Sequence, residues 1–306
     1  MDLEESHFKT RISPTPSGFL HLGNALNFVY TWLMARSHNA HLILRIDDLD
    51  APRMRSEYVE DIFRTLDWLG LDYDSGPQSP DELQKKYSQS LRIDRYRSAI
   101  EELANDSFVC SCTRKQIQQE SEDGQYPGTC RDSNLDPALM KKYAIRLKVP
   151  EGTYIEWEDL KQGPQRLNLY ASMRDFVILR KDGLPAYQIA SLIDDWDMGV
   201  NILVRGEDLK DSSAAQIFLA RKLGIDAFVR AKFLHHPLLR GMDGEKLSKS
   251  AGALSIRELR RASTKSSDIL TQIAHMLGCP NDLRIKDVHE LLLHVNHIEG
   301  LLALSK

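Results

Sequence analysis

Residues 11–24 carry side chains and a spacing that suit the binding of a phosphate group. The segment leads from an expected strand, through a loop stiffened by prolines, into an expected helix near Asn24. The unpaired backbone N–H groups and aligned peptide dipoles at a helix start both favour an anion. His21 can donate to a phosphate oxygen, and Gly23 leaves room for a nucleotide to approach the backbone. A single His-x-Gly is more often part of a turn than a ligand site, so a second motif is needed to support phosphate binding.

The second motif is the pentapeptide Lys246-Leu-Ser-Lys-Ser250, which follows a Met-Asp-Gly-Glu turn. Its two lysines flank Ser248 and can neutralise negative charge that develops on a phosphate group during a reaction. Such a reaction needs positioning and cationic stabilisation more than covalent help. A lysine-rich pentapeptide alone is usually a solvated surface segment, but together with the His21 segment it favours an enzyme with a phosphate-bearing ligand.

Three of the four cysteines lie close together in the sequence, at positions 110, 112 and 130. Three thiolates and a fourth donor can complete the tetrahedral ligand set of a structural zinc ion. Four cysteines in a chain of this length make a poor disulfide framework. Three buried, inert cysteines remain the alternative to a zinc site.

Two motifs together indicate a family. The sequence resembles the glutamyl branch of class I aminoacyl-tRNA synthetases in two segments, Pro14-Thr-Pro-Ser-Gly-Phe-Leu-His-Leu-Gly-Asn24 and Leu44-Arg-Ile-Asp-Asp-Leu-Asp50. Their two signatures correspond here to residues 21–24 and 246–250, although Asn24 departs from the histidine of the general motif. The resemblance implies that His21, Lys246 and Lys249 are catalytic, and that ATP is bound by His21, Gly23, Asn24, Lys246, Ser248 and Lys249.

The same resemblance implies a pocket for glutamate. The ammonium group would be held by Asp47 and Tyr187 and the side-chain carboxylate by Arg11 and Arg205, while Ser13 and Thr15 line the loop. A buried arginine without a carboxylate partner is costly, because hydrogen bonds to charged groups are worth about 1.5–3 kcal/mol each. Such a pocket should prefer glutamate to neutral glutamine. The alternative for Arg205 is a structural salt bridge to Asp208 or Glu207.

The cysteine segment narrows the resemblance. Cys110-Ser-Cys-Thr-Arg114 followed by Tyr126-Pro-Gly-Thr-Cys-Arg131 is similar to the zinc site of glutamyl-queuosine tRNA(Asp) synthetases. This similarity implies zinc ligands Cys110, Cys112, Tyr126 and Cys130. It also implies that glutamate, activated with ATP and Mg²⁺, is transferred to the queuosine base of tRNA(Asp), and that the long anticodon-binding domain of ordinary relatives is missing. The alternatives are a compact enzyme that charges the 3′ end of tRNA(Glu), a non-catalytic tRNA-binding paralogue, and a small-molecule adenylyltransferase.

These residues require a scaffold of alternating strands and helices. A strand at 8–12, a helix at 24–37 and a strand at 42–47 form a βαβ unit, which indicates a parallel sheet and a Rossmann-like α/β fold. Apolar spacing predicts further helices at 56–69, 91–104, 256–261, 269–277 and 288–302, and further strands at 143–149, 176–180, 186–190 and 200–204. We expect a first catalytic half at 1–104, an inserted acceptor-like zinc subdomain at 105–170, a second catalytic half at 171–250 and a helical extension at 251–306.

Composition sets the remaining expectations. The sequence is 42% hydrophobic and 27% charged, which is typical of a globular protein. Its formal net charge of −4 gives no global sign of nucleic-acid binding. Residues 226–265 hold nine Lys or Arg against four Asp or Glu, which could face a phosphate-bearing ligand or form a solvated helix surface. An acidic start and the lack of a long apolar run predict a cytoplasmic protein without membrane contact, and no protein partner is evident.

Overall fold

The central strands come from both halves of the chain in the computed structural model, which describes residues 8–49, 54–133, 135–136, 138, 142–237 and 254–298. The strands are β1 (Lys9–Ile12), β2 (His41–Leu44), β3 (Ser107–Cys110), β4 (Ala144–Leu147), β5 (Tyr154–Asp159), β6 (Gly163–Asn168), β7 (Val177–Leu179), β8 (Ile202–Gly206) and β9 (Lys232–His236). They form a parallel pair β1-β2, an antiparallel sheet β3-β4-β7 and a mixed sheet β6-β5-β9-β8.

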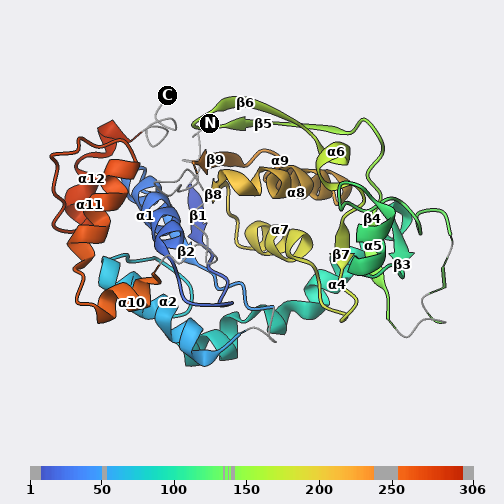
Figure 1. Ribbon diagram of the computed structural model, residues 1–306, viewed down its shortest axis with the longest axis horizontal. Helices are drawn as coiled ribbons and strands as arrows, with labels where there is room; N and C mark the ends of the chain where they lie inside the picture. Colours follow the sequence, from blue (N-terminus) through green and yellow to red (C-terminus); the bar gives the residue numbers. More distant parts are fainter. Residues whose placement is uncertain are drawn as a thin grey trace, which may run out of the picture.

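The helices surround these sheets, as Figure 1 shows. The α-helices are α1 (Leu22–Ser37), α2 (Ser56–Leu69), α3 (Pro80–Glu82), α4 (Ile93–Glu102), α5 (Arg114–Glu120), α6 (Leu169–Met173), α7 (Tyr187–Asp197), α8 (Lys210–Lys222), α9 (Asp226–Val229), α10 (Ile256–Arg261), α11 (Ser266–Met276) and α12 (Val288–Leu292). A π-helical turn η2 (Leu83–Tyr87) and the 3₁₀ turns η3 (Gln89–Arg92), η4 (Ala104–Asp106), η6 (Glu207–Leu209) and η8 (Val295–His297) complete the described elements.

The predicted βαβ unit is confirmed. β1 and β2 pair in parallel from Lys9↔His41 to Ile12↔Leu44, and α1 connects them. Ten of the sixteen residues of α1 are buried, which explains why its sequence is apolar on every side. The unit extends toward the second half of the chain, because the backbone of Asn201, just before β8, donates to Lys9 at 3.1 Å. The pocket-forming ends of β1, β2 and β8 therefore lie at one edge.

The segment around the cysteines forms a separate small sheet. β3, β4 and β7 pair antiparallel, and α5 follows β3 beside them (Figure 1). β5 and β6 also fall within residues 105–170, but β5 pairs in parallel with β9 at Asp159↔Phe233. These two strands therefore extend the sheet of β8 and β9 and do not join the cysteine-bearing sheet.

The strand predicted at 186–190 is wrong, because these residues begin helix α7. The chain turns at Lys181-Asp-Gly183 after β7, and Leu179 and Pro185 make one antiparallel bridge across this turn. The pairing then stops, and Ile189, Leu192 and Ile193 bury one face at helical spacing. The apparent strand is thus the first half of a buried helix, which places Tyr187 at the helix start.

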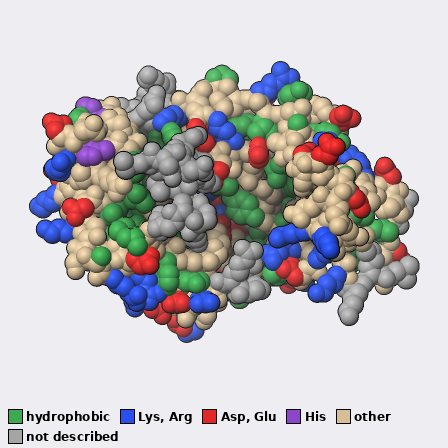
Figure 2. Space-filling model, viewed as in Figure 1, with side chains coloured by type: hydrophobic (Ala, Val, Ile, Leu, Met, Phe, Trp, Pro, Cys, Tyr) green, Lys and Arg blue, Asp and Glu red, His purple; other side chains and the backbone are tan. Residues whose placement is uncertain are grey.

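The later helices pack on the first half of the chain. Arg257 of α10 donates to Glu57 of α2 at 3.0 Å, and Arg260 of α10 pairs with Asp61 of α2. The space-filling view shows basic and acidic side chains mixed over this face of the molecule (Figure 2). For Arg257 and Arg260, these pairings favour the interpretation of a helix surface. The predicted helix at 288–302 is shorter, since α12 ends at Leu292 and residues beyond 298 lie outside the described chain.

Candidate functional site

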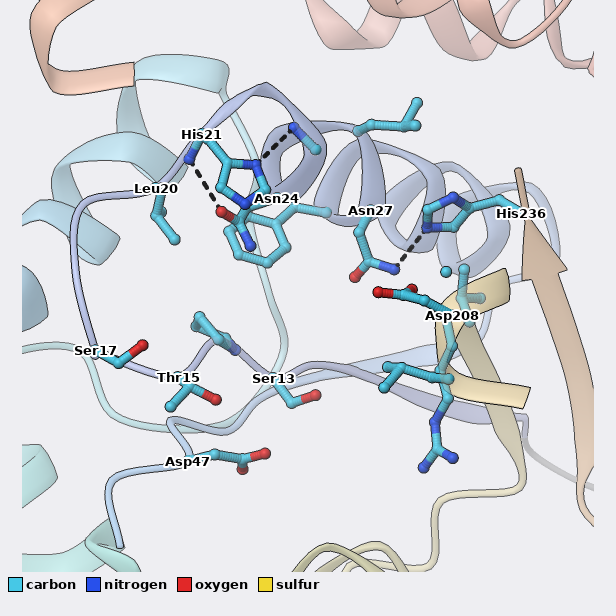
Figure 3. Close-up of a pocket in the computed structure, with 18 of the residues that line it drawn as sticks. Ser13, Thr15, Ser17, Leu20, His21, Asn24, Asn27, Asp47, Asp208 and His236 are labelled. Carbon is cyan, nitrogen blue, oxygen red and sulfur yellow. Dashed lines mark hydrogen bonds between the residues drawn. The ribbon is translucent and has the colours of Figure 1, made fainter. Parts of the chain in front are cut away.

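A cavity of about 600 Å³ opens at the carboxyl ends of the parallel strands β1, β2 and β8. In open α/β sheets this edge is the usual place for a ligand, because loops and helix starts meet there. The floor comes from the loop after β1 and from Asp47 after β2, and the start of α1 lies across the cavity (Figure 3). Tyr187 at the start of α7 and Arg205 near the end of β8 complete the lining.

His21 caps helix α1 and borders the cavity. Its Nδ1 accepts from the backbone of Gly23 at 3.0 Å, and its own backbone N–H donates to Asn24 Oδ1 at 3.0 Å. Since Nδ1 accepts a hydrogen bond, the proton of the neutral ring lies on Nε2, which is the nitrogen suited to donate to a ligand. A Cβ on Gly23 would lie 2.9 Å from the imidazole, so this glycine is needed for the approach of the His21 ring.

A buried aspartate, Asp195 of α7, lies at the centre of the charged part of the site. Its Oδ1 accepts from Arg11 Nε at 2.8 Å and from the NH1 nitrogen of Arg45 at 2.7 Å. Its Oδ2 lies 3.5 Å from Arg205. Burial opposes ionisation of Asp195, but the Arg11, Arg45 and Arg205 guanidiniums outweigh it and hold the pKa below its usual value. One carboxylate therefore organises three arginines.

The charges of this cluster are not balanced by its own residues. Three guanidiniums, those of Arg11, Arg45 and Arg205, face two carboxylates, Asp47 and Asp195. Burial lowers the pKa of Arg205, and the neighbouring Arg11 and Arg45 add to the effect, although Tyr187 and Asp195 oppose it. An additional anion in the cavity would stabilise the Arg205 cation.

Arg205 retains hydrogen-bonding capacity for such an anion. Its terminal nitrogens donate to Ser213 Oγ at 3.1 Å, to Gln216 Oε1 at 2.6 Å and more weakly to Asp195. A guanidinium has five N–H donors, and among the described residues Arg205 Nε has no acceptor although it is buried. The side chain is 2% exposed, so a ligand carboxylate would meet it in a nearly dry setting.

Asp47 gives the opposite side of the cavity a negative group. Its two oxygens accept from Arg45 at 2.7 and 3.3 Å, and its backbone N–H donates to Pro14. Burial raises the pKa of Asp47, and the nearby Asp194 and Asp195 add to this in spite of Arg45. A ligand ammonium at this carboxylate would favour its ionised form. The cavity thus offers a cationic site and an anionic site.

The predicted site residues can now be placed. Of the twelve residues predicted to bind glutamate or ATP, the structure describes nine, and all nine line this one cavity: Arg11, Ser13, Thr15, His21, Gly23, Asn24, Asp47, Tyr187 and Arg205. Lys246, Ser248 and Lys249 lie outside the described residues. The described residues on either side of their segment lie at the cavity, because His236 lines it and Ser255 forms a bridge with His21.

Sequence reasoning missed several residues of the site. Arg45 and Asp195 complete the buried charge cluster, and Asn27 and His236 join at 3.0 Å on the cavity wall (Figure 3). The alternative of a salt bridge from Arg205 to Asp208 or Glu207 is replaced by contact with Asp195. The sequence signal that could have indicated Asp195 is the Asp194-Asp195 pair directly after an apolar run.

The three clustered cysteines meet in space. Their sulfur atoms lie within 4.8 Å of one another, and Cys112 Sγ is 3.4 Å from Cys130 Sγ. The Tyr126 hydroxyl joins them, because it accepts from the Cys130 backbone N–H at 2.7 Å. Three sulfurs and one oxygen donor in this space fit the tetrahedral ligand set of zinc.

The ionisation of the thiols differs within this cluster. Burial raises the pKa of Cys112 to about 12, and its thiol neighbours add to the shift. Burial acts in the same direction on Cys130, but hydrogen bonds from Ser111, Cys112 and Tyr126 outweigh it and lower the pKa to about 7. Cys130 is therefore the more readily ionised of these two thiols.

Among the described helices, none has the length and apolar character needed to cross a bilayer.

Comparison with known proteins gives the site a context. The family model described as "tRNA synthetases class I (E and Q), catalytic domain" matches residues 7–284. The chain is 39% identical over 283 residues to a protein of Symbiobacterium thermophilum named glutamyl-Q tRNA(Asp) synthetase, and the match covers 88% of this chain and 86% of that protein. It is 32% identical over 302 residues to the glutamate–tRNA ligase of Francisella tularensis subsp. novicida, covering 95% of this chain and 62% of that enzyme.

A solved structure is similar over most of the chain. The glutamate tRNA ligase of Elizabethkingia meningosepticum, in complex with its amino acid, superposes with a TM-score of 0.76 at 26% identity. The superposition covers 96% of this chain and 66% of that structure. The chain thus spans a little under two thirds of the length of the glutamate–tRNA ligase of Francisella.

Proposed function

Since the chain belongs to the family of class I tRNA synthetases (E and Q), catalytic domain, we propose that it is a ligase that activates glutamate with ATP and transfers it to tRNA. The observation that carries this proposal is the cavity with the cationic Arg11–Arg205 side and the anionic Asp47 side, next to the capped start of α1. An amino acid with an acidic side chain has the complementary charges at its two ends.

Glutamate would bind across the cavity. Arg11 and Arg205 would receive the side-chain carboxylate, which restores the charge balance of the buried cluster. Asp47 and the hydroxyl of Tyr187 would hold the ammonium group, while Ser13 and Thr15 line the loop between them. The α-carboxylate then remains free to face the nucleotide.

ATP would bind at the start of α1. Its phosphates would accept a hydrogen bond from His21 Nε2–H and would be stabilised by the positive end of the helix dipole. Gly23 and Asn24 would lie beside them. A glutamate α-carboxylate oxygen attacks the α-phosphorus, the bond from that phosphorus to the bridging oxygen breaks, and pyrophosphate leaves. We assign Lys246, Ser248 and Lys249 to the charge that develops in this step. Mg²⁺, which accompanies ATP, would neutralise phosphate charge.

The proposed acceptor is the queuosine base of tRNA(Asp). The relative that carries the name glutamyl-Q tRNA(Asp) synthetase supports this choice, because the match spans most of both chains. The glutamate–tRNA ligase relatives support an alternative acceptor, the 3′ end of tRNA(Glu), although the match covers only part of their length.

Pyrophosphate exchange and acceptor labelling test these proposals. Glutamate-dependent ATP–pyrophosphate exchange is expected without tRNA, since the described pocket contains both proposed subsites. Labelled glutamate is then expected to attach to tRNA(Asp) that contains queuosine and not to the same tRNA without it.

Each outcome separates one alternative. Labelling of both tRNA(Asp) samples or of tRNA(Glu) would contradict the queuosine assignment while leaving the activation step intact. Lack of exchange by metal-loaded protein would favour a non-catalytic tRNA-binding paralogue. Glutamine in place of glutamate is the matched control, because it has the same shape without the carboxylate charge.

We propose that Cys110, Cys112, Tyr126 and Cys130 bind one structural zinc ion. Protein purified without chelator is expected to contain one zinc per chain by mass spectrometry of the metal. Cys130→Ser should lose most of this zinc and melt at a lower temperature, because three donors hold zinc less tightly than four. Cys279→Ser is the control, since Cys279 is also buried but lies outside the cluster. Equal zinc content in both variants would leave the cysteines as inert core residues.

A further inference from the structure

A chain of buried polar side chains crosses the sheet β5-β9-β8 behind Arg205. His235 of β9 lies opposite Arg205 of β8 in the parallel register. On one side, His235 Nδ1 lies 2.7 Å from Asp159 Oδ2 of β5, and on the other its Nε2 lies 2.9 Å from Ser213 Oγ of α8. Ser213 Oγ in turn accepts from Arg205 at 3.1 Å. Neither Asp159, His235 nor Ser213 lines the cavity.

The ionised carboxylate of Asp159 decides which group donates in each hydrogen bond of this series of side chains. Its oxygens accept the backbone N–H groups of Lys161, Gln162 and His235, each at 3.0 Å. Burial opposes its ionisation, but the hydrogen bond with His235 and these backbone donors lower its pKa. An ionised carboxylate only accepts hydrogen bonds, so His235 must donate from Nδ1.

The protonation state of His235 determines whether the Ser213 hydroxyl donates or accepts the hydrogen bond between them. Burial lowers the pKa of His235, and Arg205 and Lys210 act in the same direction, while Asp159 opposes them. A neutral ring with its proton on Nδ1 can only accept at Nε2. The Ser213 hydroxyl proton therefore points to His235, and the oxygen lone pairs face Arg205.

We propose that Asp159, His235 and Ser213 are positioning residues that hold the Arg205 guanidinium in the orientation in which it receives the substrate carboxylate. This inference rests on the proposed function, because it assigns Arg205 to glutamate. The three residues touch no substrate; they ensure that an acceptor, and never a donor, faces one terminal nitrogen of Arg205. With Gln216 at 2.6 Å on the other terminal nitrogen, the plane of the guanidinium is fixed from two sides.

Calorimetric titration with glutamate tests the inference on the whole protein. Ser213→Ala is expected to weaken glutamate binding on the order of ten-fold, since Arg205 loses one acceptor and His235 loses its donor. The affinity for ATP should stay unchanged, which a general structural defect would not allow. Ser213→Thr keeps the hydroxyl and should restore most of the affinity. Ser212→Ala is the matched control, because Ser212 precedes Ser213 in α8 and its hydroxyl accepts from Gln188 of α7 instead of Arg205.

Nitrogen NMR of the wild-type protein gives a second measurement that needs no stable Ser213 variant. The ring-nitrogen signals of His235 are assigned by their disappearance in His235→Phe. They should show the proton on Nδ1, whereas a free neutral imidazole can carry it on either nitrogen. A proton on Nε2 would overturn the inference, as would unchanged glutamate affinity in Ser213→Ala or an equal loss for glutamate and ATP. A protein that binds glutamate but catalyses no exchange loses the proposed function and keeps this inference. A protein that binds no glutamate loses both.

Discussion

Replacement of Arg205 by leucine is expected to reduce kcat/KM for glutamate roughly a hundred-fold to ten-thousand-fold in pyrophosphate exchange. The substrate carboxylate would lose two charge-assisted hydrogen bonds, each worth about 1.5–3 kcal/mol, and each 1.4 kcal/mol corresponds to about ten-fold. The preference for glutamate over glutamine should fall by a similar factor, because Arg205 distinguishes charge and not shape. Exchange measured with both amino acids over a range of concentrations gives both quantities.

The same variant should keep its stability, which separates a binding role from a structural one. Removal of Arg205 leaves two guanidiniums facing two carboxylates, so the buried cluster reaches charge balance. Because burial lowers the folded-state pKa of Arg205, its positive charge costs more free energy in the native protein than in the unfolded chain, and loss of that charge relieves this cost. A large drop in Tm alongside the loss of activity would mean that Arg205 is mainly structural. Arg166→Leu, at an exposed arginine outside the cavity, is the control.

Asp195→Asn is expected to produce the opposite combination, a large loss of stability as well as of activity. Asparagine has nearly the same shape but no charge, so Arg11 and Arg205 would lose their ion-pair partner and Arg45 would keep only Asp47. Removal of one partner from a buried ion pair costs about 3–5 kcal/mol. The expected fall in Tm is roughly 5–15 °C by calorimetry.

Asp197→Asn is the matched control on the same helix. Asp197 pairs with Arg92 and Arg95 at a partly exposed position, where such a pair contributes about 0–1 kcal/mol. Arg205→Leu added to Asp195→Asn should recover part of the lost stability, since it removes one of the uncompensated cations. Additive effects of the two changes would contradict the charge-balance argument.

The dependence of the free energy of unfolding on pH in the acid range should also change in Asp195→Asn. The folded-state pKa of Asp195 is lowered, so its contribution is fully present above the unfolded value of about 3.9 and is lost as the pH falls through the folded value. The wild-type protein should therefore lose more stability than the variant between about pH 4 and lower pH. Parallel acid limbs for the two proteins would contradict this assignment.

Local sequence patterns predicted the elements that depend on local physics. The apolar spacing at 56–69 and 256–261 predicted α2 and α10 with their observed bounds, and the order of strand, helix and strand over residues 8–47 predicted the βαβ unit. The resemblance supplied nine residues that the fold brings to one cavity. Their proposed roles, and the division into domains, stay predictions.

The rest of the site could not be read from local patterns because its contacts span the chain. Arg11 meets Asp195 across 184 positions, and nothing near Arg11 in the sequence reveals that partner. The error at 186–190 had the same consequence, since a strand that ends at residue 190 leaves Asp194 and Asp195 outside any predicted element. In helix α7 both are buried, Asp195 against Arg11 and Asp194 against Gln89 and Tyr96.

The long separation between Arg11 and Asp195 also bears on the order of folding during translation. A nascent chain that has emerged only as far as the cysteine cluster contains β1, α1 and β2, but not the carboxylate that compensates Arg11. Burying two guanidiniums against Asp47 alone is unfavourable, so this first unit cannot complete its interior until α7 has left the ribosome. Refolding fragments that end before and after α7 should therefore differ sharply in protease resistance of their amino-terminal parts.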